Sequence, residues 1–423
     1  LNLLSRIPEM QVASRTSSFA FKDMNMEVTE IASRLNVAHV LEGSVRKQGD
    51  QLRITAQLVQ ADNGFQLWSE TYDRRLDNVF QIQEDIAGAV VDALRINLLG
   101  EAPRVRTADP EAYQLFLEGQ YLKRQISTEA LHRAVEAFKQ SAAIDPSYAP
   151  AWAELADTYV WIGGSGRYTQ EEITRRADAA VQKAIAIDPD YAFAYYVRGI
   201  VYCFRQRQFQ RCTEDFQHAL ELEPDNPVLV AAIGKGALLT GDLDKAIAQY
   251  HEALNLDPVV PEFHWFLGKA YLSAGRFDEA ETTFRKLLSL APDSYGNSDL
   301  WETLFLQGKL EAAMALAESR SNRAITLYAL GDQEASDAAL EDLKENGAAW
   351  HVARVYGYRG DADATFEWLD RELEEGSWNP VFILIENAFQ GVHADERWLP
   401  LMDRLGLTEY WLAMEQAGPA DES

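Results

Sequence analysis

The stretch "PEFHWFLGKAYLSAGRFDEAETTFRKLLSLAP" (residues 261–292) predicts two short helices joined by a tight turn. Gly275 marks the turn, because glycine adopts without steric penalty the left-handed conformation in which many helices end. Pro292 ends the second helix, because proline lacks an amide hydrogen and its ring clashes with the preceding turn. One hairpin of this size buries too little apolar surface to fold alone, so we expect neighbours of the same kind.

The same pattern recurs toward the amino terminus. Prolines end five units with spacings of 43, 35, 34 and 34 residues: Pro146, Pro189, Pro224, Pro258 and Pro292. Small residues stand twelve positions before these prolines: Ala134, Ala177, Cys212, Ala246 and Ala280. Bulky residues stand eight positions before them: Phe138, Val181, Phe216, Tyr250 and Phe284. Small and bulky residues at this spacing form a helix face that packs closely on its neighbour, so the repeat predicts an all-α solenoid.

The unit at 261–292 resembles the tetratricopeptide repeat. It matches the family pattern at Leu267, Gly268, Tyr271, Gly275, Phe277, Ala280, Phe284 and Pro292. Five units in shared register cover residues 110–292. The resemblance implies a curved stack whose concave groove is lined by the first helix of each pair.

The resemblance also implies which residues line this groove. They are Val160, Trp161, Phe193, Tyr196, Ile200, Cys203, Phe204, Ala231, Lys235, Leu238, Trp265, Lys269 and Leu272. Such a groove would be aromatic and apolar with two lysines, so a hydrophobic peptide segment would fit it better than a free carboxylate. The alternative is that these aromatic side chains pack against neighbouring helices.

The two cysteines take different positions in the repeat. Cys212 stands where other units have a small buried residue, whereas Cys203 stands on the groove face. The sequence therefore predicts two structural cysteines with no bridge between them.

The repeat decays beyond residue 292 without stopping. Gly308, Gly331 and Gly360 each end an apolar segment and precede a charged one. The spacing of 23 residues between the first two is too short for a full unit, so we expect one clipped helix. We predict degenerate hairpins over residues 293–411, the last of them covered by a capping helix near 396–407. A disordered acidic tail is expected over residues 412–423.

Residues 1–99 follow a different pattern. Strands are predicted at 10–15, 37–48, 51–61 and 65–73, and helices at 28–36 and 78–98. Leu52, Ile54, Ala56 and Leu58 alternate with polar residues, which indicates a strand with one buried face. Residues 100–109 form a proline- and charge-containing linker to the repeats.

This first part resembles the TolB-amino-terminal-like module. The resemblance is carried by Glu42-Gly43-Ser44-Val45-Arg46, Leu67-Trp68 with Glu70, Tyr72-Asp73-Arg74, and Phe80 with Gln83 and Ile86. It implies a bacterial protein in which a winged-helix, nucleotide-cyclase or protein-kinase output domain lies upstream, often beyond a membrane helix. One strand of the family pattern, expected before Leu1, is missing, so we expect the chain to be a fragment.

The net charge of −27, from 39 basic and 66 acidic residues, restricts the classes of partner. Such a surface repels nucleic acid, which is bound through Lys and Arg at its phosphates. It favours apolar or basic protein partners. The alternative is that the acidity only keeps a long protein soluble.

Catalytic and ligand-binding motifs are not found in the sequence. The seven histidines are scattered, and neither a phosphate-binding glycine loop nor an HExxH zinc motif occurs. No apolar run approaches the roughly 18 residues that a membrane helix needs. We expect no catalytic site, metal or cofactor in this chain.

These features together predict a small mixed α/β domain followed by an all-α helical-repeat solenoid of tetratricopeptide repeats. We expect a scaffold or adaptor that binds a peptide or protein segment in its groove. The alternative is the sensory carboxy-terminal part of a bacterial transcriptional regulator or adenylate cyclase. The compartment is left open between cytoplasm and periplasm, and a membrane helix before residue 1 would indicate the periplasm.

Overall fold

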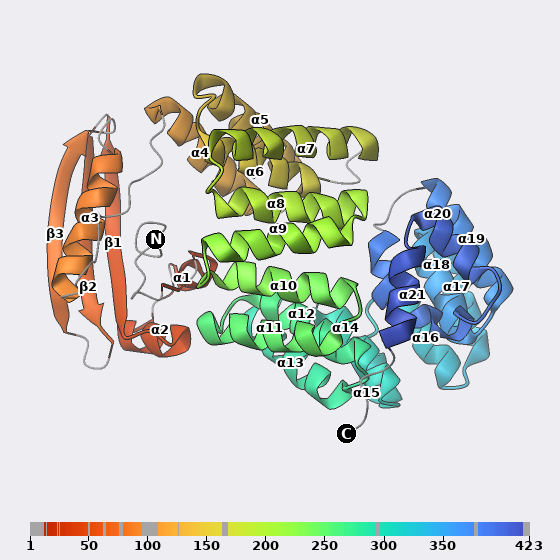
Figure 1. Ribbon diagram of the computed structural model, residues 1–423. Coiled ribbons are helices and arrows are strands. Elements are labelled where there is room, and N and C mark those ends of the chain that lie inside the picture. The colour runs from red at the N-terminus through yellow and green to blue at the C-terminus, as the bar shows by residue number, and fades with distance from the viewer. Residues whose placement is uncertain are drawn as a thin grey trace. The chain divides into compact units, whose positions relative to one another are not determined.

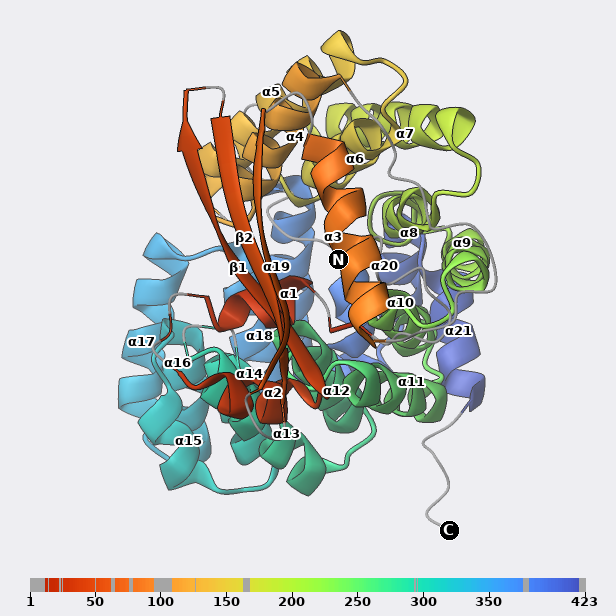
Figure 2. The same ribbon diagram turned by 90° about the vertical axis from the view of Figure 1, so that its left-hand side faces the viewer.

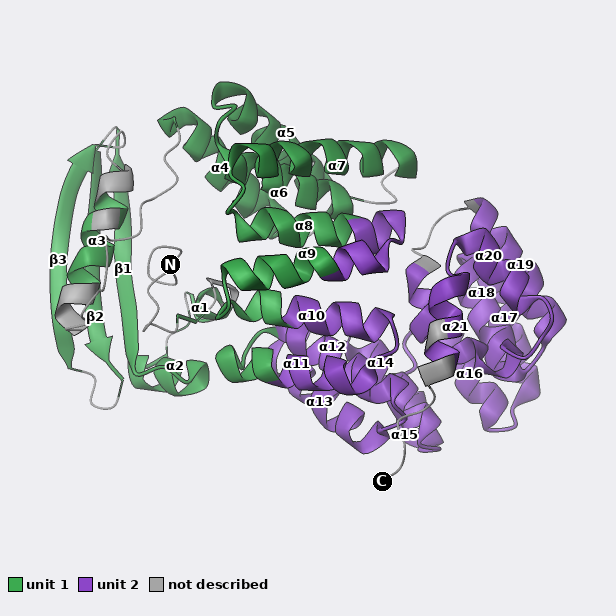
Figure 3. Ribbon diagram, viewed as in Figure 1, with its two compact units in different colours: residues 1–201, 214–230, 252–260 green, residues 202–213, 231–251, 261–423 purple. Residues whose placement is uncertain are grey.

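The computed structural model divides into two compact units, which we describe separately (Figure 3). Unit 1 comprises Leu1–Val201, Glu214–Val230 and Glu252–Val260, and unit 2 comprises Tyr202–Thr213, Ala231–His251 and Pro261–Ser423. The structure describes residues 12–13, 15–22, 24, 26–49, 51–61, 65–75, 79–94, 109–125, 127–162, 168–292, 294, 296–375 and 380–417. The predicted linker therefore lies almost wholly outside the described residues.

The first part of unit 1 contains a small antiparallel sheet in the strand order β1-β2-β3. Its elements are α2 (Val28–Leu35), β1 (His39–Gln48), β2 (Gln51–Gln60), β3 (Gln66–Arg75) and α3 (Val79–Leu94). Helix α3 lies against one face of the sheet (Figure 1, Figure 2). Leu52, Ala56 and Leu58 are buried along β2, Ile54 is half-buried and Arg53 is exposed, so the predicted alternation holds up to Leu58. It breaks at the irregularity between Leu58 and Val59, where Val59 is buried as well. The layer is the predicted mixed α/β domain.

The predicted strand at residues 10–15 falls mostly outside the described residues. Its last residue, Arg15, begins a helix, α1 (Arg15–Ala20), so the strand prediction is wrong at that end. In α1, the hydroxyl of buried Ser17 donates a hydrogen bond of 2.5 Å to Asp257. In α3, the side chain of Gln83 donates one of 3.0 Å to the hydroxyl of Tyr113. Within unit 1, both bonds join the first 99 residues to the helical repeats.

The repeats of unit 1 are helix pairs. They comprise α4 (Pro110–Lys123), α5 (Thr128–Ile144), α6 (Ala149–Trp161), α7 (Gln170–Ile187), α8 (Ala192–Val201) and part of α9 (Phe209–Leu222). The carboxylate of Asp109 caps α4, and Thr169 with Glu172 forms a capping box at α7. Gly119 in α4 lies directly over the ring of Phe138 in α5, which shows how small residues allow the two helices to approach closely.

Unit 2 continues the series with α10 (Pro227–Leu239), α11 (Leu243–Leu256), α12 (Pro261–Ser273) and α13 (Phe277–Leu290), of which the first two also contribute residues to unit 1. Gly241 and Gly275 turn the chain between the paired helices at φ values of 80° and 70°. Gly268 lies over the ring of Phe284, which repeats the contact between Gly119 and Phe138. In these two hairpins a glycine of the first helix thus meets the bulky residue that stands eight positions before the terminal proline of the unit.

The degenerate part of the chain forms further helix pairs. They are α14 (Gly296–Leu306) with α15 (Leu310–Leu316), α16 (Arg320–Ala329) with α17 (Gln333–Asn346), and α18 (Ala349–Arg359) with α19 (Ala362–Glu375). Gly308, Gly331 and Gly360 all have positive φ at the turns. Helix α15 has only 7 residues, so it is the clipped helix that the short glycine spacing predicts.

The carboxy-terminal end of unit 2 is less regular. It comprises the 3-10 turns η4 (Pro380–Ile385) and η5 (Asn387–Val392), then α20 (Trp398–Leu405) and α21 (Thr408–Ala417). Helix α20 occupies the segment predicted to cap the array, and Arg404 pairs with Asp370 of α19. The predicted disordered tail is corrected in part: residues 412–417 belong to α21, because buried Trp411 anchors this helix beside Trp398. Residues 418–423 lie outside the described part.

Candidate interaction surface

In unit 1 the predicted groove residue Trp161 ends helix α6 with 52% of its surface exposed. Its indole nitrogen donates a hydrogen bond of 3.2 Å to Asp157 one turn earlier. Lys123 of α4 contacts Asp157 as well, and its ammonium lies 2.6 Å from Glu154. Burial disfavours the charged lysine, but these two carboxylates outweigh burial and raise the pKa of Lys123. Trp161 is therefore an exposed aromatic side chain on a rigid, charge-paired support.

The next groove residues in unit 1 pack mainly against their own neighbours. The rings of Phe193 and Tyr196 stack at 5.8 Å, and Tyr196 stacks on Phe216 of α9 at the same distance. Val160 and Ile200 are buried. Phe193 and Tyr196 thus follow the alternative expectation that the groove aromatics pack against neighbouring side chains, and both are only partly exposed.

In unit 2 the apolar groove residues are buried, apart from Phe204 and Trp265. Ala231, Leu238 and Leu272 have almost no exposed surface. Phe204 is partly exposed and packs against Phe382 of η4, with the ring centroids 6.0 Å apart. In this conformation the carboxy-terminal segment already covers part of the side chain that was expected to face a partner.

The two predicted groove lysines are paired internally. Lys235 lies 4.6 Å from the ring centre of Phe266 and 3.1 Å from a carboxylate oxygen of Glu262. Lys269, with 8% of its surface exposed, lies 3.3 Å from Asp299 and 3.7 Å from Glu302 of α14. The indole of Trp265 donates a hydrogen bond of 2.7 Å to Asp299 as well. These side chains connect the successive first helices α10, α12 and α14.

The contacts of Lys269 belong to a larger buried ion network that was not predicted from the sequence. Arg354 of α18 pairs with Glu386 at 3.1 Å, and the Tyr358 hydroxyl donates a bond of 2.6 Å to Glu302. Two cations, Lys269 and Arg354, thus lie among three carboxylates, those of Asp299, Glu302 and Glu386. One signal was available in the sequence: Asp299 stands 34 residues after Trp265, which is one repeat length.

Burial and charge pairing shift the pKa values of this network in different directions. Burial raises the pKa of Asp299 and also that of Glu386. Burial alone would raise the pKa of Glu302 too, but Lys269 and Arg354 outweigh it and lower that pKa. Arg354 itself is held charged, because the two glutamates outweigh its burial and raise its pKa. The pKa of each of these groups therefore depends on the charges of its neighbours in the network.

The ten residues predicted to bind a partner thus fall into three groups that differ in exposure. Trp161 is exposed, Phe193, Tyr196, Phe204 and Trp265 are partly buried, and Ile200, Lys235, Leu238, Lys269 and Leu272 are buried. The buried residues stabilise contacts between helices in this conformation. Binding of a partner by the remaining set stays a prediction.

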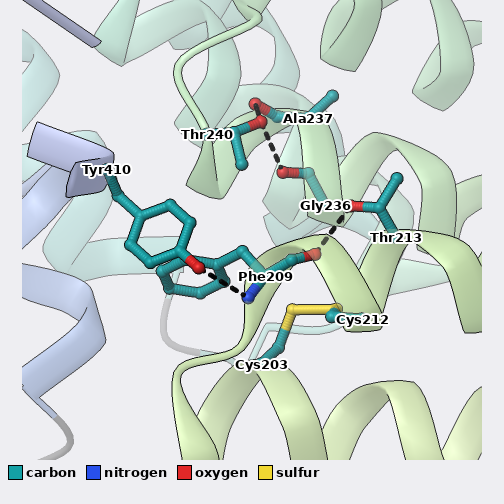
Figure 4. The surroundings of a disulfide bond; sticks show 8 residues. All are labelled: Cys203, Phe209, Cys212, Thr213, Gly236, Ala237, Thr240 and Tyr410. Atoms are coloured by element: carbon teal, nitrogen blue, oxygen red, sulfur yellow. Dashed lines mark hydrogen bonds between the residues drawn. A yellow bond between two sulfur atoms is a disulfide. The ribbon is translucent and has the colours of Figure 1, made fainter. Parts of the chain in front are cut away.

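The prediction that the cysteines are unbridged is wrong. Cys203 and Cys212 form a disulfide, with their Cα atoms 5.4 Å apart, and both are fully buried (Figure 4). The cause is the turn between α8 and α9, which has no glycine and instead contains a short π-helix, η3 (Tyr202–Gln206). The register of a regular repeat would place Cys203 on the groove face, whereas this wider turn allows it to face Cys212.

Two classes of site find no support in the part of the chain that the structure describes. No group of three or more His, Cys, Asp or Glu side chains is placed to hold a metal ion there. None of the described helices combines the length and the apolar character needed to cross a membrane.

Comparison with known proteins identifies the repeat. The tetratricopeptide repeat family matches residues 232–295. A 164-residue stretch is 37% identical to the protein named putative adenylate cyclase 3 of Rhizobium meliloti (strain 1021), covering 36% of this chain and 27% of that protein. The chain therefore spans about a quarter of the length of this relative.

Solved structures of similar proteins include two with tetratricopeptide repeats. TTC0263, a thermophilic TPR protein in Thermus thermophilus, is 24% identical, with a TM-score of 0.39 over 48% of this chain and 99% of its own. YrrB, a TPR protein with an unusual peptide-binding site, is 20% identical, with a TM-score of 0.34 over 47% of this chain and 99% of its own.

Proposed function

We propose that this tetratricopeptide repeat protein is a non-catalytic scaffold that binds a segment of another protein through the first helices of its repeats. The observation that carries the proposal is the exposure of Trp161 at the end of α6, whereas the other nine residues predicted to bind a partner are partly or fully buried. Large aromatic side chains on rigid supports are the residues that most often anchor protein interfaces. Trp161 fits this role because its indole is fixed by Asp157.

The chemistry around Trp161 indicates the kind of partner. Asp157 and Glu154 lie close by, and both pair with the ammonium group of Lys123. The whole chain carries a net charge of −27, which attracts basic segments over roughly 10 Å at moderate salt. We therefore propose a peptide segment that combines an apolar side chain for Trp161 with a nearby Lys or Arg.

The proposal is tested with peptides selected on the intact chain from a random display library. Trp161→Ala should weaken the selected peptides at least about tenfold, the usual loss at an interface anchor. Leu399→Ala is the matched control, because Leu399 is another large exposed apolar residue, with 45% of its surface exposed, on α20. Equal binding by both variants, or failure to enrich any peptide, would contradict the proposal.

A second candidate function follows from the partial match to a putative adenylate cyclase. In this proposal the chain is the sensory part of a longer regulator, and an output domain upstream of Leu1 carries the activity. The test is the sequence of the gene upstream of the Leu1 codon. A cyclase or winged-helix domain in the same reading frame would support the sensory role, and a start codon close to Leu1 would support a stand-alone scaffold.

A further inference from the structure

The turn between α8 and α9 differs from the two hairpin turns that follow it. Gly241 and Gly275 allow the left-handed conformation in the next two hairpins. Here the turn contains no glycine, and Arg207 takes the left-handed conformation with a φ of 55°, which residues with a side chain adopt rarely. The disulfide ties Cys203 in this turn to Cys212 in α9. The covalent bond thus holds a turn whose sequence does not favour its own geometry.

The same turn holds the carboxy-terminal helices of unit 2. The guanidinium of Arg207 donates a hydrogen bond of 2.9 Å to the carbonyl oxygen of Leu405, the last residue of α20. The amide of Phe209 donates one of 3.2 Å to the hydroxyl of Tyr410 in α21, and the two rings meet edge to face at 4.2 Å (Figure 4). These contacts join segments about 200 residues apart in sequence, and both start from the short loop that the disulfide closes.

The neighbouring turn contributes a further contact to α21. Met414 packs so closely on Gly241 that an added Cβ would lie 2.7 Å from its side chain. Helix α21 therefore rests on two consecutive hairpin turns, one held by glycine and one held by the disulfide. Only the second can be altered by a chemical reaction.

We propose that Cys203 and Cys212 form a reversible thiol–disulfide site that controls docking of α20 and α21 on the α8–α9 turn. The reaction partner is a dithiol reductant. One of its thiolates attacks a cysteine sulfur, which breaks the S–S bond and gives a mixed disulfide. Its second thiol then closes the reductant's own disulfide, so that two electrons and two protons pass to the protein and leave two cysteine thiols.

Reduction removes the covalent tie that holds Phe204, Arg207 and Phe209 in position. Without the tie, Arg207 can leave the left-handed conformation, and its bond to Leu405 and the contact between Phe209 and Tyr410 are then lost. The coupling is reciprocal: the disulfide favours docking of α20 and α21, and this docking in turn favours the disulfide. Since both cysteines are fully buried, a thiolate reaches the sulfur only when this region opens.

Hydrogen exchange of the intact chain, before and after treatment with dithiothreitol, tests the first half of the proposal. Amides of α20 and α21 should exchange roughly tenfold faster after reduction, while those of α12 and α13 keep their rates. The variant Cys203→Ser with Cys212→Ser should exchange fast without reductant and show no response to it. Unchanged rates in α20 and α21, or a uniform increase that includes α12 and α13, would overturn the proposal.

The rate of reduction tests the reciprocal half on a chain with both cysteines in place. Tyr410→Ala removes the ring and hydroxyl that contact Phe209, so dithiothreitol should reduce the disulfide several times faster. Leu412→Ala is the matched control, because Leu412 lies on the same helix with an exposed side chain. Equal reduction rates in the two variants would show that docking does not protect the bond.

Discussion

A stretch of unit 1 and a stretch of unit 2 join their helices by different interactions on the same repeat scaffold. In unit 1, Phe193, Tyr196 and Phe216 form a continuous stack of aromatic rings. In unit 2, the corresponding first helices carry Lys269 and Asp299 in a buried ion network. The repeat pattern therefore sets where helices touch and leaves open how the touching faces are filled.

Apolar packing and buried ion pairs respond differently to a single substitution. Removing an apolar side chain costs the lost contacts and the cavity left behind, and the neighbours relax partly into the space. Removing one partner of a buried ion pair leaves an uncompensated charge away from water, which is costlier than the pair's net contribution. The ion network around Lys269 in unit 2 should therefore be more sensitive to a single substitution than the aromatic stack of Phe193, Tyr196 and Phe216 in unit 1.

The largest effect is expected from Lys269→Ala. Asp299 and Glu302 would lose their shared cation while still buried, so unfolding in urea should show a loss of about 3–5 kcal/mol. Arg320→Ala is the control, because its pair with Asp342 is half exposed in the same unit and should cost no more than about 1 kcal/mol. Equal losses would mean that the network adds nothing beyond ordinary surface pairing.

A second pair of variants tests what the units share. Gly119→Ala and Gly268→Ala each place a methyl group within 2.7 Å and 2.5 Å of a phenylalanine ring, Phe138 and Phe284 respectively. Both should lower the free energy of unfolding by about 1–3 kcal/mol, the usual cost of overpacking a core. Gly88→Ala, where nothing lies within 4 Å, is the control. A large difference between the first two would show that the hairpins are packed differently after all.

The smallest effect concerns pH and His393 near the end of unit 2. Its ring meets those of Trp398 and Trp411 at 4.4 Å each, and burial lowers its pKa from 6.5 to about 4. The unfolded chain binds the proton below about pH 6.5 while the folded chain does not, so stability falls as the pH drops from about 6.5 to about 4.

This dependence is measured as the difference between the wild type and His393→Gln. The comparison is needed because other groups titrate as well. Glu302 has a lowered pKa, so its contribution to the stability of the fold is also lost in acid. Asp299 and Glu386 have raised pKa values, so their protonation in acid favours the folded state. The melting temperature of the variant should decline less between pH 7 and pH 4.5. Parallel curves for the two proteins would exclude a contribution from His393.

Most of the fold could be predicted from the sequence because its signals are local. The spacing of Gly268 and Phe284 fixes which faces of adjacent helices meet, and the alternation of Leu52, Ala56 and Leu58 fixes one face of the sheet. The candidate site was predicted less completely. Trp161 is exposed as expected, but Lys269 is buried because Asp299 and Glu302 approach it from the next helix pair.

The sequence by itself determined the helix pairs, their turns at glycine and the order of the sheet followed by the solenoid. Only the tertiary structure decided the Cys203–Cys212 bond, the bond from Tyr358 to Glu302 and the contact between Phe209 and Tyr410. The physical reason is the range of the interactions. Repeat patterns encode contacts between helices adjacent in sequence. The disulfide instead depends on a non-standard turn, and the other two contacts join residues that lie 56 and 201 positions apart in the chain.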